Sequence, residues 1–215
     1  MDYHNYSKIR FKQNKSRDIV WQEIAKYLQK KFIPAISIIL DLGSGYCDFI
    51  NNIRAKKKYA LDKFINPEKF ASNETIPIFG DFNLADKIIE DCSLDIILAS
   101  NFFEHLDEAE LERYIKMILS KLKNGGKLII IQPNYFLCYK NYFDDYTHIK
   151  AWSHISLPDF LKSRGFYIDL TKPRFLPFSI KSNLPKYKLL IRAYLNSPIK
   201  PFAGQMLVIA RKPYN

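Results

Sequence analysis

Between residues 36 and 132 the sequence alternates short apolar runs with amphipathic segments, and this alternation constrains the fold more than any other feature. The apolar runs indicate buried strands, and the segments between them carry apolar residues at helical spacing. Strands that alternate with helices predict an α/β protein with a parallel sheet covered on both faces. The predicted strands are Ile36–Leu42, Lys58–Leu61, Thr75–Phe79, Leu94–Ala99, Lys127–Gln132, Phe166–Leu170 and Gln205–Ala210.

The helices are predicted from the same periodicity and from their end signals. Asp107 is a suitable N-cap, and Asn124-Gly125-Gly126 provides a stop signal after the helix that Asp107 begins. No internal repeat or domain boundary interrupts the pattern, so a single domain over residues 1–215 is predicted. The predicted helices are Arg17–Lys31, a segment near Cys47–Arg54, one near Leu84–Glu90, Asp107–Lys123, one near Leu157–Ser163 and Lys186–Leu195.

Composition excludes several other classes of protein. With 47% hydrophobic residues and only 7 Gly and 11 Pro, the chain is neither disordered nor collagen-like. No apolar run reaches the roughly 18 residues of a membrane span, and the first residues lack an apolar signal region, so a cytoplasmic protein is expected. Cys47, Cys92 and Cys138 are too widely spaced to indicate a disulfide framework or a zinc cluster.

The net charge of +11 is concentrated in the flanks of the chain. Residues 1–31 carry eight Lys or Arg against three acids, and residues 171–215 carry nine Lys or Arg and no acid. Residues 32–170 are slightly acidic, with sixteen basic and nineteen acidic side chains. This distribution suits an anionic partner such as a phosphorylated substrate, a membrane surface or a nucleic acid. A surface charge that only keeps the protein in solution is the alternative.

A glycine-rich turn follows the first predicted strand, in the segment Asp41-Leu42-Gly43-Ser44-Gly45. Glycines at the end of a strand let the backbone turn sharply and approach a ligand closely. In an open parallel sheet, ligands bind beyond the carboxyl ends of the strands, which is where this turn lies. Asp62 ends the second predicted strand, and an acid at that place can bind the hydroxyls of a ribose.

A nicotinamide-binding fold uses similar parts, but two observations argue against it here. Asp41 directly precedes the glycines, where its charge would repel the pyrophosphate that such a turn cradles. Cys47 and Asp48 stand where the dinucleotide fingerprint has its third glycine. S-adenosylmethionine carries an ammonium and a sulfonium but no phosphate, so an acid before the glycines favours this ligand.

The glycine turn is the first of several motifs that together resemble the class I S-adenosylmethionine-dependent methyltransferases. In chain order the matching segments are Asp41-Leu42-Gly43-Ser44-Gly45, Asp62, Gly80-Asp81-Phe82, Ala99-Ser100-Asn101-Phe102-Phe103-Glu104-His105-Leu106, Lys123-Asn124-Gly125-Gly126-Lys127-Leu128 and Gln132-Pro133-Asn134. The resemblance implies a Rossmann-like, doubly wound sheet of seven strands, mostly parallel, with an antiparallel last strand at Gln205–Ala210. Asp144-Asp145-Tyr146-Thr147-His148 and the flanks look like a bacterial subgroup often encoded beside glycosyltransferases.

The resemblance also implies which residues bind the cofactor. The glycine turn would hold the methionine end, and Asp62 would bind the ribose hydroxyls. Asp81, with the amide that follows it, would contact the adenine edge, and Asn101 with its neighbour would line the sulfonium region. A solvated strand end for Asp62 and a helix cap for Asp81 are the alternatives. The full set is Asp41, Gly43, Ser44, Gly45, Asp62, Asp81, Phe82, Asn101 and Phe102.

Methyl transfer to a hydroxyl needs a base to take the proton, and histidine is best matched to neutral pH. His148 is the predicted base, with Asp145 as the carboxylate that orients it, and His105 is the second candidate. A histidine that only anchors its loop is the alternative for His148, and a role at a helix entry is the alternative for His105. Tyr146 and Trp152 are predicted to contact the acceptor.

Three segments outside the cofactor motifs are each predicted to have a distinct structural role. Residues 1–35 would form an N-terminal helical cap, residues 133–155 an acceptor loop or lid, and residues 171–204 a basic insertion before the last strand. Asp144, Asp145 and His148 form only a poor pattern for metal binding, so no metal site is predicted.

The predicted function is therefore O-methylation of a small polar or anionic acceptor, such as a capsule or surface-polysaccharide precursor or its phosphate-linked decoration. S-adenosylmethionine would be the cofactor and S-adenosylhomocysteine the product. An RNA or DNA methyltransferase and a non-catalytic cofactor-binding scaffold are the alternatives. The segment Asn101-Phe102-Phe103-Glu104 differs from the Asn-Pro-Pro-Tyr type of base methylases, which disfavours a nucleic acid. Contact with the inner face of the membrane and a homodimer are further expectations.

Overall fold

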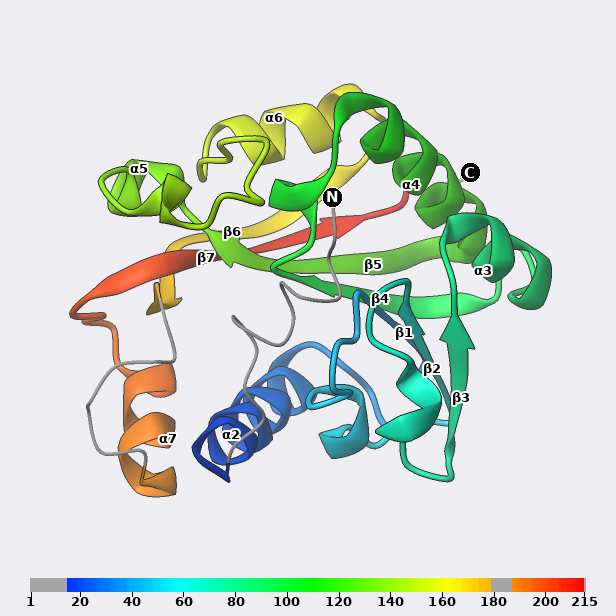
Figure 1. Cartoon of the computed structure of the whole chain (residues 1–215), viewed down its shortest axis with the longest axis horizontal. Coiled ribbons are helices and arrows are strands. Elements are labelled where there is room, and N and C mark those ends of the chain that lie inside the picture. Colours follow the sequence, from blue (N-terminus) through cyan, green and yellow to red (C-terminus); the bar gives the residue numbers. More distant parts are fainter. Residues whose placement is uncertain (1–14, 179–186, 215) are drawn as a thin grey trace.

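A seven-stranded sheet forms the centre of the computed structural model, which describes residues 15–178 and 187–214 (Figure 1). The strands are β1 (Ile38–Leu42), β2 (Lys57–Asp62), β3 (Thr75–Phe79), β4 (Leu94–Ser100), β5 (Leu122–Pro133), β6 (Tyr167–Pro177) and β7 (Ala203–Arg211). Their order is β3-β2-β1-β4-β5-β7-β6, and β7 alone runs antiparallel to its neighbours. The predicted α/β sheet with an antiparallel last strand is confirmed.

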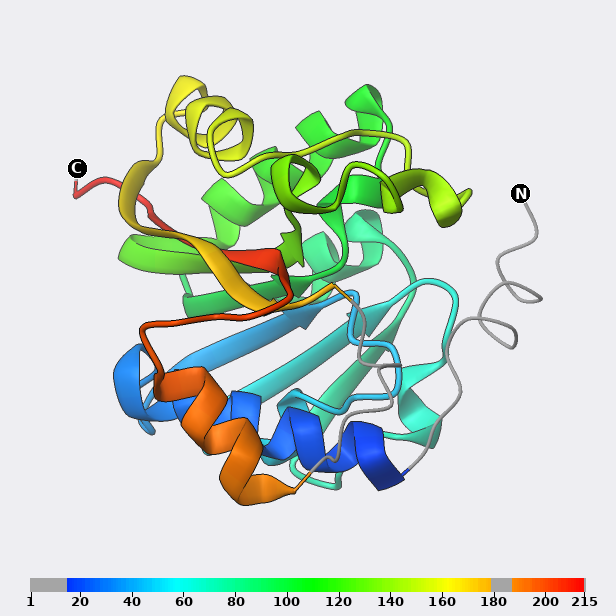
Figure 2. The ribbon, with the colours of Figure 1, turned by 90° about the vertical axis from the view of Figure 1, so that its left-hand side faces the viewer.

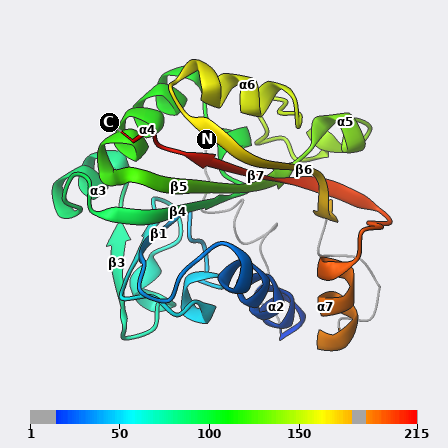
Figure 3. The same ribbon diagram turned by 180° about the vertical axis from the view of Figure 1, so that it is seen from behind.

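Helices cover both faces of this sheet, as predicted. The α-helices are α2 (Lys15–Lys31), α3 (Phe82–Ile88), α4 (Glu108–Lys121), α5 (Tyr135–Cys138), α6 (Ser156–Ser163) and α7 (Lys188–Asn196). Helices α3, α4 and α6 lie on one face, and α2 and α7 lie side by side on the other (Figures 2 and 3). An ion pair between Glu23 of α2 and Arg192 of α7, 3.0 Å long, joins the latter two.

Two hydrophobic clusters fill the spaces between the sheet and these two layers. Because side chains alternate along a strand, Leu40 packs with Ile115 of α4 on one face, while Ile39 packs with Ile24 of α2 on the other. Each of these four side chains is at most 1% exposed. The same alternation places Asp41 on the α2 side of the sheet, where the binding edge described below is formed.

Three element predictions are wrong. The strand expected over Phe166–Leu170 continues to Pro177, so the first residues of the expected 171–204 insertion belong to β6 and pair with β7. The helix expected near Cys47–Arg54 is a turn followed by the short 3-10 helix η1 (Ile50–Asn52). Cys47 has φ of +60°, a left-handed conformation that cannot continue a right-handed helix. The fifth strand begins at Leu122 instead of Lys127, because Leu122 already pairs with Leu94 and the glycines form an irregularity within the strand.

The remaining expectations on organisation are tested only in part. The structure describes α2 within the expected 1–35 cap and α7 within the expected 171–204 insertion, whereas residues 1–14 and 179–186 lie outside the described residues. A single domain over 1–215 stays a prediction. Among the helices of the described residues, none has the length and apolar character that crossing a membrane requires.

Candidate functional site

The glycine turn after β1 leaves an open space at the carboxyl edge of the sheet. Gly43 and Gly45 have φ of +75° and +52°. A Cβ at Gly43 would stand 2.5 Å from the Phe102 ring, whereas a Cβ at Gly45 would meet nothing within 4 Å. Glycine at position 43 therefore permits close packing on the tip of β4, and glycine at position 45 borders the pocket that the turn lines.

Asp62, at the end of β2, fixes this turn by accepting backbone hydrogen bonds. Its Oδ2 accepts the N–H of Gly45 at 2.9 Å, and its Oδ1 accepts those of Phe64 and Ile65 at 2.8 Å each. A carboxylate has about four lone-pair sites, so Oδ2 keeps one for a ligand hydroxyl. Burial raises the pKa of Asp62, and the three N–H groups oppose that shift.

Asp41 lies beneath the turn and is 3% exposed. Burial, reinforced by the charges of Asp62 and Asp48, raises the pKa of Asp41 to about 8, although the N–H of Ile50 donates to it. Asp48 pairs with Arg17 of α2 at 2.5 Å. The turn therefore encloses an acidic group that a positively charged ligand would hold in its ionised form.

One pocket brings most of the predicted cofactor residues together. Its lining extends from the glycine turn past Asp62 to Asn101 and Phe102 at the tip of β4, and on to His105. Asn101 adopts a left-handed φ of +49°, and its Oδ1 accepts from Gln205 of β7 at 3.4 Å. The lining includes Asp41, Gly43, Ser44, Gly45, Asp62, Asn101 and Phe102.

Asp81 and Phe82 lie outside this lining, although their neighbour Gly80 is part of it. Asp81 is the N-cap of α3, because its carboxylate accepts the N–H of Asn83 at 3.0 Å. The ring of Phe82 packs edge-on against Tyr114 at 5.2 Å. The helix-cap alternative for Asp81 is therefore confirmed, and adenine contact by this pair stays a prediction.

Two pocket residues from α2 were not predicted from the sequence. Trp21 is 6% exposed and lines the pocket, and its Nε1 has no hydrogen-bond partner in the described part of the chain. Arg17 lies one helical turn earlier and also lines the pocket. Trp21 falls on the apolar face of an amphipathic helix, so sequence periodicity marks it as core and gives no sign of a ligand.

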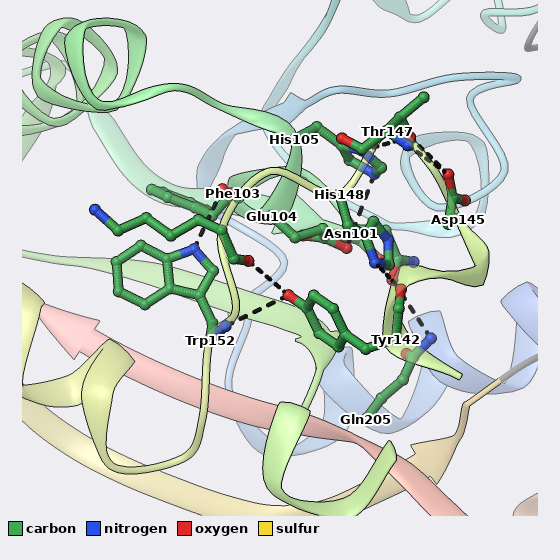
Figure 4. Close-up of polar contacts among 12 residues, drawn as sticks. Asn101, Phe103, Glu104, His105, Tyr142, Asp145, Thr147, His148, Trp152 and Gln205 are labelled. Atoms are coloured by element: carbon green, nitrogen blue, oxygen red, sulfur yellow. Dashed lines mark hydrogen bonds and ion pairs between the residues drawn. The ribbon is translucent and has the colours of Figure 1, made fainter. Parts of the chain in front are cut away.

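The predicted acceptor loop is anchored to the tip of β4 through His105 (Figure 4). The Nδ1 of His105 lies 3.0 Å from Oγ1 and 3.2 Å from the carbonyl oxygen of Thr147. Thr147 Oγ1 in turn donates to Asp145 Oδ1 at 2.7 Å. Asp145, predicted to orient His148, is thus linked to His105 through Thr147.

His148 lies directly behind His105, with the two ring centres 5.0 Å apart. Its Nδ1 lies 2.6 Å from the carbonyl oxygen of Tyr142, a buried side chain of the same loop. His105 lines the pocket. Burial, together with the nearby His148, lowers the pKa of His105 to about 4, so its imidazole is neutral at pH 7.

Glu104, between Phe103 and His105, is a further polar residue that sequence reasoning left without a role. It is 0% exposed, and neither carboxylate oxygen has a hydrogen-bond partner in the described residues. Burial, with the charge of Asp145, raises the pKa of Glu104 to about 8. Its position beside a histidine at a strand tip was the only sequence signal that was available.

The two predicted acceptor contacts lie in different environments. Tyr146 is 62% exposed on the loop. Trp152 is 3% exposed, belongs to the core cluster beneath α6, and donates from Nε1 to the carbonyl oxygen of Phe103 at 3.2 Å. Because its indole is enclosed by core residues, Trp152 supports the loop and does not line the pocket.

Comparison with known proteins identifies the fold of this chain but no family. No protein-family model matches the chain. An uncharacterised protein of Methanocaldococcus jannaschii is 28% identical over 133 residues, which cover 62% of this chain and 56% of the relative. The chain therefore spans little more than half the length of that curated relative.

Solved structures share the fold over nearly the whole chain. An S-adenosylmethionine-dependent methyltransferase of Archaeoglobus fulgidus is 22% identical, with a TM-score of 0.67 and coverage of 98% of this chain and 99% of its own. One of Clostridium acetobutylicum is 14% identical, with a TM-score of 0.64 and coverage of 99% and 98%. The 1,6-didemethyltoxoflavin-N1-methyltransferase of Burkholderia thailandensis, solved with S-adenosylhomocysteine and 1,6-didemethyltoxoflavin, is 14% identical, with a TM-score of 0.58 and coverage of 90% and 79%.

This chain therefore has the fold of the S-adenosylmethionine-dependent methyltransferases, and that part of the resemblance is confirmed. The subgroup associated with surface glycans stays a prediction. The alternatives of a nucleic-acid methyltransferase and a non-catalytic scaffold likewise stay predictions.

Proposed function

We propose that this protein is an S-adenosylmethionine-dependent methyltransferase that methylates an oxygen of a small polar acceptor. The observation that carries the proposal is the pocket at the carboxyl edge of β1, where the open space at Gly45 meets the remaining lone pair of Asp62. In a parallel sheet this edge, next to the point where the strand order reverses, is where ligands bind.

The pocket residues fit the chemical groups of the cofactor. The buried Asp41 suits an ammonium, and Asp62 Oδ2 suits a ribose hydroxyl. Two donors lie on the wall beside the turn, where they suit a carboxylate: the guanidinium of Arg17, and the Nε1 of Trp21, which has no partner among the described residues. The Phe102 ring offers an apolar face, and rings attract cations such as a sulfonium.

The backbone after the turn argues against a dinucleotide. A pyrophosphate is normally bound at the N-terminus of the helix that follows the glycine loop. Residues 43–56 are all described, and they contain only turns and η1. Residues 43–56 therefore offer no α-helix dipole, and the acids Asp48 and Asp62 lie close enough to Asp41 for their charges to act on it.

Bound S-adenosylmethionine supplies an electrophilic methyl group, which passes to the acceptor oxygen and leaves S-adenosylhomocysteine. The protein aligns the acceptor and provides a group that takes its proton. His105 is placed for this because it lines the pocket and its Nδ1 is held by Thr147. His148 lies behind His105 and forms the second member of the pair.

The acceptor is proposed as a small polar or anionic molecule such as a surface-glycan precursor. Support comes from the resemblance of the Asp144–His148 segment and from the net charge of +11. Helix α7 exposes Leu189 and Leu190, 74% and 53% exposed, in a segment without acidic residues. This surface suits peripheral contact with an anionic membrane that carries such a precursor.

The first test is calorimetric titration with S-adenosylhomocysteine, comparing wild type with Asp62→Asn. The substitution removes the carboxylate charge and retains side-chain size, and we expect the affinity to fall by ~10-fold or more, about 1.4 kcal/mol. Asp159→Asn is the matched control, since the Asp159 carboxylate pairs with Lys162 on the surface of α6, outside the lining of the pocket. A flat titration of folded wild type, or equal affinities in the two variants, contradicts the proposal.

A further inference from the structure

Three side chains at the tip of β4 converge on one point beside the pocket (Figure 4). Glu104, His105 and His148 each offer one ligand atom, and these atoms all lie within 4.8 Å of one another. Glu104 is completely buried, and both of its carboxylate oxygens lack a hydrogen-bond partner in the described residues. Leaving a buried polar group without a partner is costly, so this carboxylate calls for an explanation.

The hydrogen bonds fix which nitrogen of His105 carries the proton. Thr147 Oγ1 donates its own hydrogen to Asp145, so it must accept from Nδ1 of His105, 3.0 Å away. The Thr147 carbonyl, at 3.2 Å, is also only an acceptor. Nδ1 therefore bears the hydrogen, and Nε2 presents its lone pair, 4.0 Å from Glu104 Oε1.

The same argument applies to His148. Its Nδ1 lies 2.6 Å from the Tyr142 carbonyl oxygen, which can only accept, so Nδ1 again carries the hydrogen. Metal-binding histidines commonly donate their other ring N–H to a carbonyl or to a polar group in this way, which fixes the ring and its tautomer. Both histidines thus resemble ligands that are already oriented.

A direct hydrogen bond does not account for the cluster. The 4.0 Å between His105 Nε2 and Glu104 Oε1 exceeds hydrogen-bond length. Ligands bonded at ~2.0–2.2 Å to one ion stand roughly 3–3.5 Å apart, so closure by about 1–1.5 Å would bring the three ligand atoms within bonding distance of one ion. Such a movement is within the reach of side-chain torsions at the edge of a pocket.

We propose that Glu104, His105 and His148 bind a divalent transition-metal ion. Two imidazoles and one carboxylate suit Zn²⁺, Mn²⁺ or Fe²⁺, whereas Mg²⁺ and Ca²⁺ prefer sites made of oxygen ligands. The expectation of no metal site, which considered only Asp144, Asp145 and His148, overlooked the buried Glu104 because exposure cannot be read from a single sequence.

The position of the ion gives it a role that rests on the proposed function. Because His105 lines the pocket, an ion held there lies at the wall where the acceptor oxygen would be. Three protein ligands leave coordination positions open, and a bound ion lowers the pKa of a coordinated hydroxyl, whose proton passes to solvent. The ion and His105 are therefore two ways to remove the same proton: in the metal-free site His105 takes it, and with the ion bound both Nε2 lone pairs serve as ligands and the proton passes to solvent.

Calorimetry of metal binding without any S-adenosyl compound tests the site itself. The full chain carrying Cys92→Ser, which removes the exposed thiol, is stripped with EDTA, dialysed and titrated with MnCl₂ and with ZnCl₂. We expect one metal ion to bind per chain. Glu104→Gln and His148→Gln should weaken binding by ~100-fold or more, since each removes a ligand. His154→Gln is the matched control and should leave the affinity unchanged, because His154 bonds to Asn134 outside the cluster.

Thermal unfolding of the stripped variants separates loss of a ligand from loss of the fold. Glu104→Gln should unfold close to the wild-type temperature or above it, because the amide replaces a buried carboxyl group that has no hydrogen-bond partner in the described residues. Co²⁺ substitution should give visible absorption bands that His148→Gln abolishes and His154→Gln retains. No saturable binding by folded protein, or binding unchanged in Glu104→Gln and His148→Gln, overturns the metal site. Either result leaves the S-adenosylhomocysteine titration unaffected, so failure of the metal site and failure of the proposed function are distinguishable.

Discussion

At the scale of single residues, four of the eight left-handed residues in the described part of the chain lie in the two turns that form the pocket. Gly43, Gly45 and Cys47 follow β1, and Asn101 follows β4, with φ between +49° and +75°. Hydrogen bonds hold the two that have side chains, since the N–H of Cys47 donates to Ser44 and that of Asn101 to Ile131, each at 2.8 Å. Strained backbone of this kind persists only where the surroundings determine it, and it concentrates at functional sites.

Gly45→Ala tests whether the space at the turn belongs to a ligand. A methyl group there meets no protein atom within 4 Å, and the positive φ of +52° is the only structural cost, about 1 kcal/mol or somewhat more. We expect S-adenosylhomocysteine affinity to fall by ~10-fold or more, because the methyl group enters the pocket. Gly165→Ala is the matched control, with φ of +89° and equally open space at the end of α6. If both variants bind like wild type, the space at Gly45 is not the ligand site.

The two tryptophans of the chain lead to opposite predictions for the affinity of S-adenosylhomocysteine. Trp21→Phe removes an Nε1 donor that has no partner in the described residues but keeps an aromatic ring in the pocket wall. The melting temperature should change little, because loss of a buried donor that has no partner in the described residues offsets part of the packing lost with the larger ring. S-adenosylhomocysteine affinity should fall by about 5- to 10-fold, as expected for one lost hydrogen bond of ~1–1.5 kcal/mol. Thermal unfolding measures the melting temperature, and calorimetry on the same sample measures the affinity. Unchanged affinity would show that Trp21 only packs.

At the scale of secondary-structure elements, the second tryptophan ties the acceptor loop to the sheet. Trp152→Phe deletes the bond to the Phe103 carbonyl and leaves that buried oxygen without this donor, a cost of about 1–3 kcal/mol. The melting temperature should therefore fall, and protease cleavage within residues 139–151 should become faster. S-adenosylhomocysteine affinity should remain within twofold of wild type, because Trp152 does not line the pocket. A loss of affinity without a loss of stability would contradict this assignment.

Most elements were predictable because hydrophobic periodicity reports burial directly. The strand Thr75–Phe79 was predicted with its observed limits, and the cap at Asp107 is confirmed by its bond from the Glu110 N–H at 2.8 Å. The helix after the glycine turn was predicted wrongly because periodicity carries no information on backbone angles. Cys47 is left-handed and Ile53 is extended, so only the short η1 forms between them. The early start of β5 depends on pairing with β4, which is a tertiary contact.

The residues of the candidate site were likewise predictable only where the sequence carries a local signal. The glycine turn and Asp62 were predicted because strand ends carry recognisable local signals. Trp21 and Glu104 were missed because their significance is the absence of a hydrogen-bond partner after burial, which only the fold creates. The link from Asp145 to His105 was also missed, since it passes through Thr147 and joins segments 40 residues apart or more.

At the scale of the whole molecule, the buried acid of the binding edge affects global stability. Burial and the neighbouring charges of Asp62 and Asp48 raise the pKa of Asp41 from 3.8 to about 8. Between these values the folded chain retains a proton that the unfolded chain has lost, so the free energy of unfolding falls as pH rises and levels off above pH 8. One such proton accounts for a slope of up to about 1.4 kcal/mol per pH unit. Urea denaturation in EDTA at pH 6 and pH 8.5 measures that slope.

Asp41→Asn identifies the source of this slope, because an amide of the same shape cannot ionise. Two other buried acids contribute to the slope in the same direction: the pKa of Asp62 is raised, and that of Glu104 is raised to about 8. Burial raises the pKa of the Cys47 thiol to about 12, so this group contributes little. We expect Asp41→Asn to lose roughly half of the slope or less, because Glu104 retains a proton over the same pH range. The variant should be more stable than wild type at pH 8.5, while S-adenosylhomocysteine binds less tightly. A ligand ammonium beside Asp41 favours its carboxylate, so binding to wild type at pH 7 should release a proton. Calorimetry in two buffers of different ionisation enthalpy detects that release. An unchanged slope in Asp41→Asn, or binding without proton release, would show that this acid does not serve the ligand.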